Sequence, residues 1–216
     1  MIDSISITID NKKIEVSKGT TLLELSKMVQ EHYDLPIILA KVDDQYKELS
    51  FVLLNDARVE FLTLKDRHGN RAYLSGLVYM LVYAARKVLR NNELTVQHSI
   101  DKGLYVSTKK KITPEQIALL KEEMKNIVKL NLPIEKLNVN RIDAIDYFEK
   151  VSDYSKKELL KYNTNSFITL YKLGNIYNFF FSLMPVETRC LERFDLKYLN
   201  ENGFVLLYQT VYMKDG

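Results

Sequence analysis

Apolar and polar residues alternate strictly at the start of the chain. Over residues 4–9, three isoleucines are separated by serine and threonine, which predicts a strand with one buried face. The polar run at residues 10–13 predicts a turn, and residues 14–17 resume the alternation. The two alternating segments should therefore pair as a hairpin.

A helix is expected directly after the hairpin. Thr20 or Thr21 can cap it, and Glu24 places a carboxylate in the first turn, where the helix dipole favours negative charge. The helix should end before Pro36. Its apolar stripe consists of Leu22, Leu25, Met28 and Val29. Two more strands are predicted at residues 37–42 and 59–64, and this order of elements is typical of a β-grasp, ubiquitin-like domain.

The polar, glycine-containing run Asp66–Asn70 predicts a domain boundary, which divides the chain into residues 1–65 and 66–216. A long helix with a wide apolar face should follow over residues 71–89. A second stripe on the same helix carries Ser75, Tyr79, Tyr83 and Arg86.

The rest of the chain mixes strands and helices. A capping box, Thr113 to Gln116 with Pro114 in the first turn, predicts the start of another helix. Other predicted elements are a strand pair at 95–107, a strand at 134–139, a helix at 141–151, strand-like segments over 166–203 and a final strand at 204–212. The fold class that we predict is α+β.

Composition indicates a soluble protein with an ordinary core. Hydrophobic residues make up 46% and charged residues 27% of the 216 residues. Neither a membrane-spanning apolar run nor a signal peptide is recognisable, so we expect a cytoplasmic protein without membrane contact. A single cysteine, Cys190, fits a reducing compartment and is expected to be an inert thiol.

Charge differs between the two predicted domains. Residues 1–65 carry 8 basic and 11 acidic side chains, whereas residues 66–216 carry 23 basic and 17 acidic ones. The second domain could therefore attract a polyanion, although an ordinary solvated surface has a similar balance.

Two stretches of sequence resemble known domains. Residues 16–64, with VSKGTTLLEL, AKVDD and VEFLTL, resemble the TGS domain, a β-grasp module of threonyl-tRNA synthetases, certain GTPases and stringent-response enzymes. Residues 71–212 resemble the second N-terminal domain of threonyl-tRNA synthetase, its editing domain. The matching segments include RAYLSGLVYMLVYAARKVL, VQHSIDKGLYVS, the long segment from ITPEQIALL to IDAIDYF, and YKLGNIYNFF. The resemblance implies a β-grasp domain followed by an α+β editing-like domain.

The resemblance also implies that a hydrolytic site has been lost. Editing domains carry His-x-x-x-His on the first helix and Cys-x-x-x-His on a later loop. Here the first pair falls on Ser75 and Tyr79, and the second, counted back from Pro185, falls on Phe179 and Leu183. Neither phenylalanine nor leucine can act as acid, base, nucleophile or metal ligand, and serine needs an adjacent base. We therefore predict no catalytic residue and no metal site in this chain.

A similar arrangement occurs in the N-terminal half of a bacterial uridine kinase-like family. There a phosphoribulokinase/uridine kinase domain follows the two domains, and the aromatic loop also lacks the cysteine and histidine. The resemblance implies a downstream kinase domain as partner in the same chain, and ATP and magnesium as cofactors of that domain only. The sequence itself contains no G-x-x-x-x-G-K-[ST] phosphate-binding loop, so no cofactor is expected within residues 1–216.

Two sets of residues are candidates for binding. A remodelled pocket for a small ligand could be lined by Ser75, Tyr79, Tyr83, His98, Tyr177, Phe179 and Leu183, with stacking on the aromatic run. Phosphate or RNA contacts could come from Lys109, Lys110, Lys111, Lys156 and Lys157. The alternatives are a polar helix face, a structural histidine, core aromatics and solvated lysines.

Three functions follow from these observations. The first is a non-catalytic accessory region of a nucleoside kinase that binds a small ligand or an RNA. The second is a free-standing tRNA- or RNA-binding module derived from threonyl-tRNA synthetase. The third is an aminoacyl-tRNA deacylase with a replaced site, which would depend on Ser75 and Tyr79.

Overall fold

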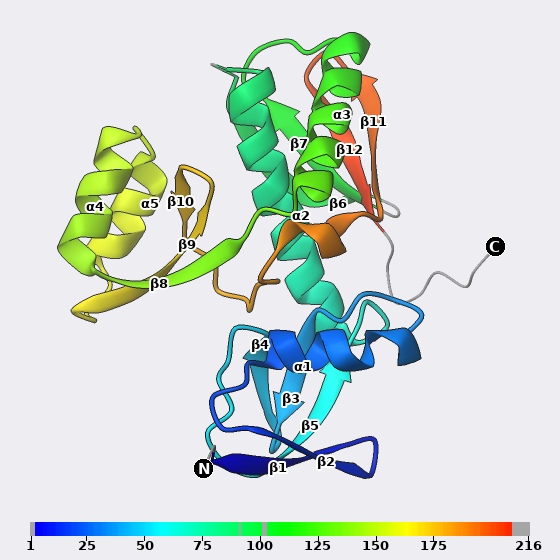
Figure 1. Cartoon of the computed structure of the whole chain (residues 1–216). Helices are drawn as coiled ribbons and strands as arrows, with labels where there is room; N and C mark the ends of the chain where they lie inside the picture. The colour runs from blue at the N-terminus through cyan, green and yellow to red at the C-terminus, as the bar shows by residue number, and fades with distance from the viewer. Residues whose placement is uncertain (1–2, 91, 101–102, 209–216) are drawn as a thin grey trace.

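The structure is a computed structural model that describes residues 3–90, 92–100 and 103–208. Its fold is α+β, as predicted, with three separate sheets arranged around one long helix, α2. In Figure 1, α2 rises from the N-terminal sheet to a four-stranded sheet, and a smaller sheet with two short helices lies to one side.

The N-terminal sheet has the β-grasp arrangement. Its strand order is β2-β1-β5-β3-β4; β1 and β5 pair in parallel, and the other pairs are antiparallel. The strands are β1 (Ser4–Ile9), β2 (Lys12–Ser17), β3 (Leu39–Val42), β4 (Gln45–Glu48) and β5 (Ala57–Leu62). The predicted hairpin is confirmed, whereas the polar strand β4 was not predicted.

Helix α1 (Leu22–Val29) packs on this sheet and begins at the predicted cap. Thr21 and Glu24 form a complete capping box, which satisfies two backbone amides that the helix itself cannot pair. Leu22 and Leu25 are buried, but the predicted burial of Met28 is wrong, since 62% of it is exposed. Val29 still packs against the core one turn beyond Leu25, so Met28 lies outside the buried face of the helix.

Helix α2 (Arg67–Val88) starts earlier than the sequence predicts. Residues 67–70, predicted to be a linker, form its first turn, and Gly69 is buried there against the backbone of Thr63. The chain therefore passes from β5 into α2 through only a few residues. The division into domains 1–65 and 66–216 stays a prediction.

The four-stranded sheet has the order β11-β12-β7-β6 and is antiparallel throughout. Its strands are β6 (Leu94–Ile100), β7 (Gly103–Thr108), β11 (Phe194–Asn200) and β12 (Gly203–Tyr208). Helix α3 (Pro114–Leu130) begins at the predicted Thr113 cap, which forms a capping box with Gln116. Within the strand pair predicted at 95–107, residues 101–102 fall outside the described residues, as does the end of the last predicted strand, 209–212.

The smaller sheet, with order β10-β9-β8, carries two short helices. Its strands are β8 (Ile134–Asn140), β9 (Phe167–Leu173) and β10 (Ile176–Asn178), and its helices are α4 (Arg141–Lys150) and α5 (Tyr154–Lys161). Helix α5 was not predicted. The segment 179–193, expected to be strand-like, is instead an irregular loop that contains the 3-10 turn η2 (Thr188–Leu191).

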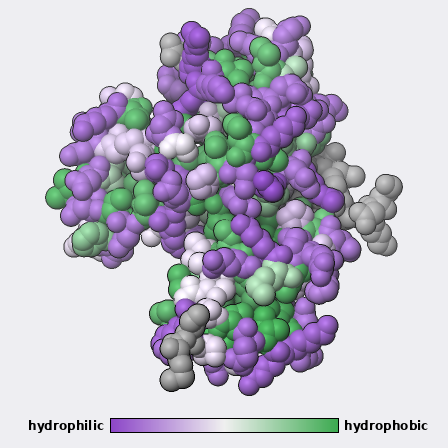
Figure 2. All heavy atoms as spheres, in the orientation of Figure 1, coloured by the Kyte–Doolittle hydropathy of each residue, from purple (hydrophilic) through white to green (hydrophobic). Residues whose placement is uncertain are grey.

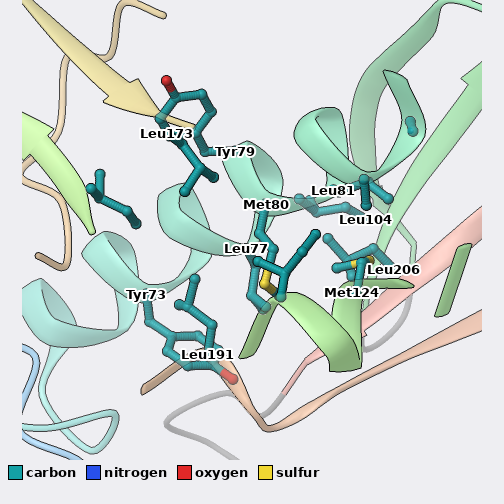
Figure 3. Packing of buried hydrophobic residues seen from close by; sticks show 14 of the residues in the cluster. Tyr73, Leu77, Tyr79, Met80, Leu81, Leu104, Met124, Leu173, Leu191 and Leu206 are labelled. Carbon is teal, nitrogen blue, oxygen red and sulfur yellow. The ribbon is translucent and has the colours of Figure 1, made fainter. Parts of the chain in front are cut away.

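The largest core cluster surrounds α2. Figure 3 shows Leu77, Met80 and Leu81 of α2 together with Leu104, Met124 and Leu206 from the four-stranded sheet and α3. Hydrophilic residues cover much of the face shown in Figure 2, while apolar atoms reach the surface near the β-grasp region. None of the helices within the described ranges combines the length and apolarity that crossing a bilayer would require.

Candidate functional site

The four positions that the resemblance assigns to editing residues lie near the middle of α2 and in the 179–193 loop. Tyr79 is fully buried, and its hydroxyl lies 2.6 Å from the carbonyl oxygen of Tyr171 and 2.7 Å from that of Ile176. Burial raises the pKa of Tyr79 well above its usual range, so the phenol stays neutral. The hydroxyl of Tyr79 is therefore used inside the core, and Tyr79 lines neither of the two pockets described below.

Aromatic rings fill the space beside Tyr79. The ring of Phe180 lies 5.1 Å from that of Tyr79 and 6.1 Å from that of Tyr171. Leu183 also packs against this core, and Phe179 packs edge-on against Phe181 at 4.8 Å. Aromatic packing of this kind stabilises the fold and leaves no acid or base at these positions.

Ser75 has no partner that could activate it as a nucleophile. Within the described ranges, its hydroxyl donates to the Arg71 carbonyl at 3.1 Å or pairs with the hydroxyl of Ser182 at 2.6 Å. Neither group is a base at neutral pH. The four positions together therefore lack the groups that general acid–base hydrolysis needs.

Glu48 of β4 contacts this region from the β-grasp side. The sequence analysis did not identify it as a site residue. Its side chain is only 5% exposed, and Oε1 accepts hydrogen bonds from the Tyr171 hydroxyl at 2.5 Å and the Met184 amide at 3.0 Å. The ammonium of Lys136 lies 3.1 Å from Oε2. Burial, followed by the hydrogen bond to Glu48 and its charge, raises the pKa of Tyr171 well above its usual range. No periodic or motif signal marks Glu48, because its partners are more than 80 residues away.

A polar cleft of about 870 Å³ opens next to the second half of α2. Its walls come from the end of α2, the start of β6, the α4–α5 connection and β10. Arg86 and Arg90 line one wall, and in the described part of the chain neither guanidinium has an ion-pair or hydrogen-bond partner. Two unpaired guanidinium groups make this wall positively charged, and both are available to bind an anionic ligand.

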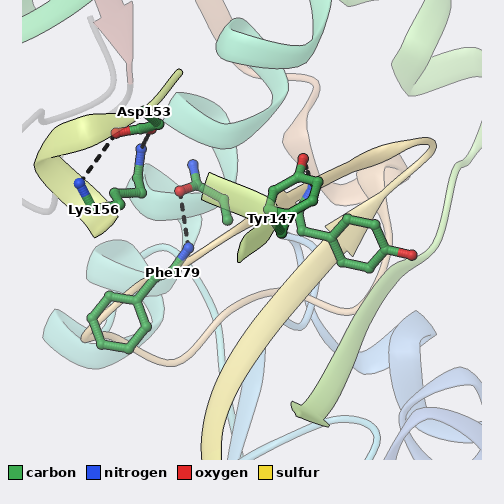
Figure 4. A network of polar contacts seen from close by, with 6 residues as sticks. Tyr147, Asp153, Lys156 and Phe179 are labelled. Carbon is green, nitrogen blue, oxygen red and sulfur yellow. Dashed lines mark hydrogen bonds and ion pairs between the residues drawn. The ribbon is translucent and has the colours of Figure 1, made fainter. Parts of the chain in front are cut away.

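The opposite wall carries Lys156 and two aromatic residues. Lys156 pairs with Asp153, the N-cap of α5 (Figure 4), which offsets its charge. Tyr154 is 61% exposed, and Tyr177 packs edge-on against Tyr147 at 5.1 Å, with the Tyr177 amide donating to the Tyr147 hydroxyl at 3.0 Å. Of the residues singled out from the sequence, Lys156, Tyr177 and Arg86 of the polar stripe on α2 line this cleft.

The other predicted basic residues lie elsewhere. Lys109 pairs with Glu93, Lys111 with Glu201 and Lys157 with Glu149, and all three ion pairs are at the surface. Lys110 is exposed without an ion pair among the described residues. The three loop lysines line neither this cleft nor the second pocket described below.

The two remaining pocket candidates and the thiol are also apart from the cleft. His98 is exposed on β6, with its ring 6.1 Å from that of Tyr105. Tyr83 packs against the backbone at Gly174. The thiol of Cys190 donates to the Glu187 carbonyl at 3.2 Å, and burial raises its pKa well above the usual range, which disfavours the reactive thiolate.

Comparison with known proteins agrees with this architecture. Threonine–tRNA ligases of Desulforamulus reducens and Clostridium kluyveri are 28% and 29% identical to the chain over 159 and 175 residues, which are 72% and 79% of it. The threonine–tRNA ligase of Oceanobacillus iheyensis is 24% identical over the full length of the chain. The chain is homologous to the N-terminal region of threonine–tRNA ligases.

The homology covers only part of these ligases. The chain spans 25%, 28% and 35% of the lengths of the three relatives. No protein-family model matches the chain. The relatives give no support for an association with a uridine kinase domain, so that part of the expectation stays a prediction.

Proposed function

We propose that this chain is a non-hydrolytic RNA-binding module derived from the N-terminal region of a threonine–tRNA ligase. The observation that carries the proposal is the cleft with two unpaired arginines, Arg86 and Arg90. The chain that holds this cleft is homologous to threonine–tRNA ligases. Binding without hydrolysis fits the filled space around Tyr79, where no acid–base pair is present in the described residues.

The arginines supply the phosphate contacts. A guanidinium presents several donors in one plane and matches the oxygens of a phosphate, and such contacts hold a nucleic acid without reading its sequence. Because the charge of Lys156 is already met by Asp153, the arginines contribute most of the free positive charge in the cleft. Loss of either arginine should therefore weaken binding more than loss of Lys156.

Tyr154 and Tyr177 supply surfaces for bases. Both line the cleft, and the ring of Tyr154 is mostly exposed. Stacking of a base on an aromatic side chain contributes about 1–3 kcal/mol in single-stranded complexes and tolerates any sequence. The cleft is therefore suited to a single-stranded end, such as the acceptor end of a tRNA, more than to a duplex.

Fluorescence anisotropy with a 3′-labelled uncharged tRNA tests the proposal. We expect binding that weakens steeply as salt rises, because each neutralised phosphate releases counterions. Arg86→Ala and Arg90→Ala should each lower the affinity and reduce the slope of log K against log salt by about 1. The matched control is Arg58→Ala, which removes an exposed arginine from β5 of the β-grasp sheet. Affinity and slope that are the same in all four proteins would refute the proposal.

A deacylation assay separates binding from hydrolysis. The chain is expected to hydrolyse a mischarged threonine-specific tRNA no faster than buffer alone does. If turnover were seen and then abolished by Ser75→Ala, the deacylase function would replace the one proposed here.

A further inference from the structure

A second pocket, of about 540 Å³, lies between the β-grasp region and the 179–193 loop. One wall is formed by α1 and residues 33–38, and the other by residues 185–192. The lining is mostly apolar, with Leu23, Ile38 and Pro185 among the residues that form it. Its volume is within the range of about 300–1,000 Å³ that small-molecule sites commonly have.

Hydrogen bonds hold both walls in place. On the β-grasp side, the Gln30 amide donates to the Leu35 carbonyl at 3.1 Å and accepts from the Ile37 amide at 3.2 Å. On the other side, the side chain of Asn131 donates to Glu187 at 3.1 Å and accepts from the Arg189 amide at 3.1 Å. A pocket with fixed walls binds a ligand with a small ordering cost.

The rim of the pocket carries charges of both signs. Lys27 projects from α1 and Arg189 from η2, and within the residues that the structure describes neither side chain is in an ion pair. Glu192, on the second wall, likewise forms no ion pair with any described residue. Of the other two carboxylates in the lining, Asp34 pairs with Lys65, and Glu187 accepts from the Asn131 side chain. The free Lys27 and Arg189 therefore suit a carboxylate, and the free Glu192 suits an ammonium group.

We propose that this pocket binds a small zwitterion with an apolar body, of the class of a short apolar peptide. The apolar lining takes the aliphatic side chains, Lys27 and Arg189 take the carboxylate, and Glu192 takes the ammonium. The site is separate from the arginine-lined cleft, since the two pockets share no lining residue. Binding here therefore does not depend on the RNA-binding function.

Calorimetric titration with the dipeptide Leu-Leu tests this assignment. We expect saturable binding to the full chain with a dissociation constant of about 1 mM or lower. N-acetyl-Leu-Leu-amide keeps the apolar body but lacks both charges, and it should bind at least about tenfold more weakly. Leu-Leu-amide and N-acetyl-Leu-Leu lose one charge each and should fall between the two.

Substitutions at the rim locate the binding. Arg189→Glu and Lys27→Glu should each weaken Leu-Leu binding at least about fivefold, since each places a carboxylate where the ligand carboxylate lies. Both residues are exposed, so the fold should be kept, and circular dichroism checks this. Lys197→Glu makes the same charge change at an exposed position of β11 and should leave binding unchanged.

Three results would overturn the proposal. They are the absence of Leu-Leu binding up to about 10 mM, equal binding of the end-blocked dipeptide, and equal effects of Arg189→Glu and Lys197→Glu.

Discussion

Buried tyrosines show how a single residue type changes its role with its surroundings. The chain has 14 tyrosines and no tryptophan, and Tyr73, Tyr79 and Tyr171 lie almost entirely inside the fold. The hydroxyl of Tyr73 donates to the Arg193 carbonyl at 3.0 Å and accepts from its amide at 2.9 Å, while Tyr171 donates to Glu48. These phenols connect distant parts of the backbone, so they act as structural donors and not as surface for a ligand.

The hydroxyl of Tyr79 should make a measurable contribution to stability. Tyr79→Phe leaves the carbonyls of Tyr171 and Ile176 without this donor inside the core, and an unsatisfied buried group costs about 1–3 kcal/mol. We expect urea denaturation to show a loss of that size. The control is Tyr83→Phe, whose hydroxyl has no hydrogen-bond partner among the described residues. Equal stabilities of the two variants would mean that Tyr79 contributes through its ring alone.

The same tyrosines predict a loss of stability at alkaline pH. Burial raises the pKa values of Tyr73, Tyr79 and Tyr171, and it raises that of the less buried Tyr33 to about 12. A folded-state pKa above the unfolded value of about 10 means that the folded chain keeps a proton which the unfolded chain releases. The stabilisation is therefore complete below about pH 10 and is lost as pH rises above it, by at most about 1.4 kcal/mol per pH unit for each such group.

Denaturation curves recorded between pH 8 and pH 11 measure this slope. Tyr79→Phe should give a shallower fall above pH 10, because one buried phenol no longer titrates. A fall that begins well below pH 10, or one that is unchanged in Tyr79→Phe, would assign the pH dependence to other groups.

At the level of elements, the start of α2 shows why local sequence patterns mislead. Polar residues around a glycine predict a loop at 66–70, yet residues 67–70 form a helical turn. Close packing requires glycine at position 69, since a Cβ there would lie 2.1 Å from the Thr63 carbonyl oxygen. The backbone of Thr63 is held in turn by Asp66, whose side chain accepts from its amide at 2.7 Å. Only the tertiary contact distinguishes this glycine from a flexible one.

Gly69→Ala should therefore destabilise the chain. In an unconstrained helix the change from glycine to alanine stabilises by about 1 kcal/mol, but here the added methyl group must displace backbone. We expect a net loss of about 1–3 kcal/mol in chemical denaturation. Arg71→Ala, at an exposed position on the same helix, should change stability by less than about 0.5 kcal/mol. If Gly69→Ala were as stable as the native chain, the β5–α2 connection would be more adaptable than the structure indicates.

Elements with strong local signals were predictable, and elements that depend on distant partners were not. The capping boxes at Thr21 and Thr113 placed two helix starts correctly, because caps and periodic stripes are encoded within a few residues. Strand β4 and helix α5 are short and mostly polar, so their residues carry little periodic signal. The lining of the candidate cleft was predicted only in part. Lys156 and Tyr177 were predicted as binding residues, whereas Arg90 was not, because it comes close to them only in the folded chain.

At the scale of the whole molecule, the β-grasp region and the second region share a buried apolar core, to which Leu39 and Leu62 contribute, and a buried carboxylate, Glu48. Glu48 comes from an edge strand of the β-grasp sheet and contacts Tyr171, Met184 and Lys136, all from the second region. A buried carboxylate is tolerated when such partners surround it, and removing it leaves them unpaired. Glu48 should therefore contribute to the relative position of the two regions, together with the apolar core that they share.

Removal of this carboxylate gives a test of how the two regions are coupled. Glu48→Ala leaves the Tyr171 hydroxyl and the Met184 amide without their acceptor, and we expect a loss of about 2–3 kcal/mol. Half of Lys136 remains in water and adds little to that cost. Hydrogen exchange at the Met184 amide should rise in parallel. Glu60→Ala, which removes an exposed glutamate from the neighbouring part of the same sheet, should leave both measurements unchanged. If Glu48→Ala and Glu60→Ala behaved alike, apolar contacts such as that of Val186 with the β-grasp core would hold the regions together without Glu48.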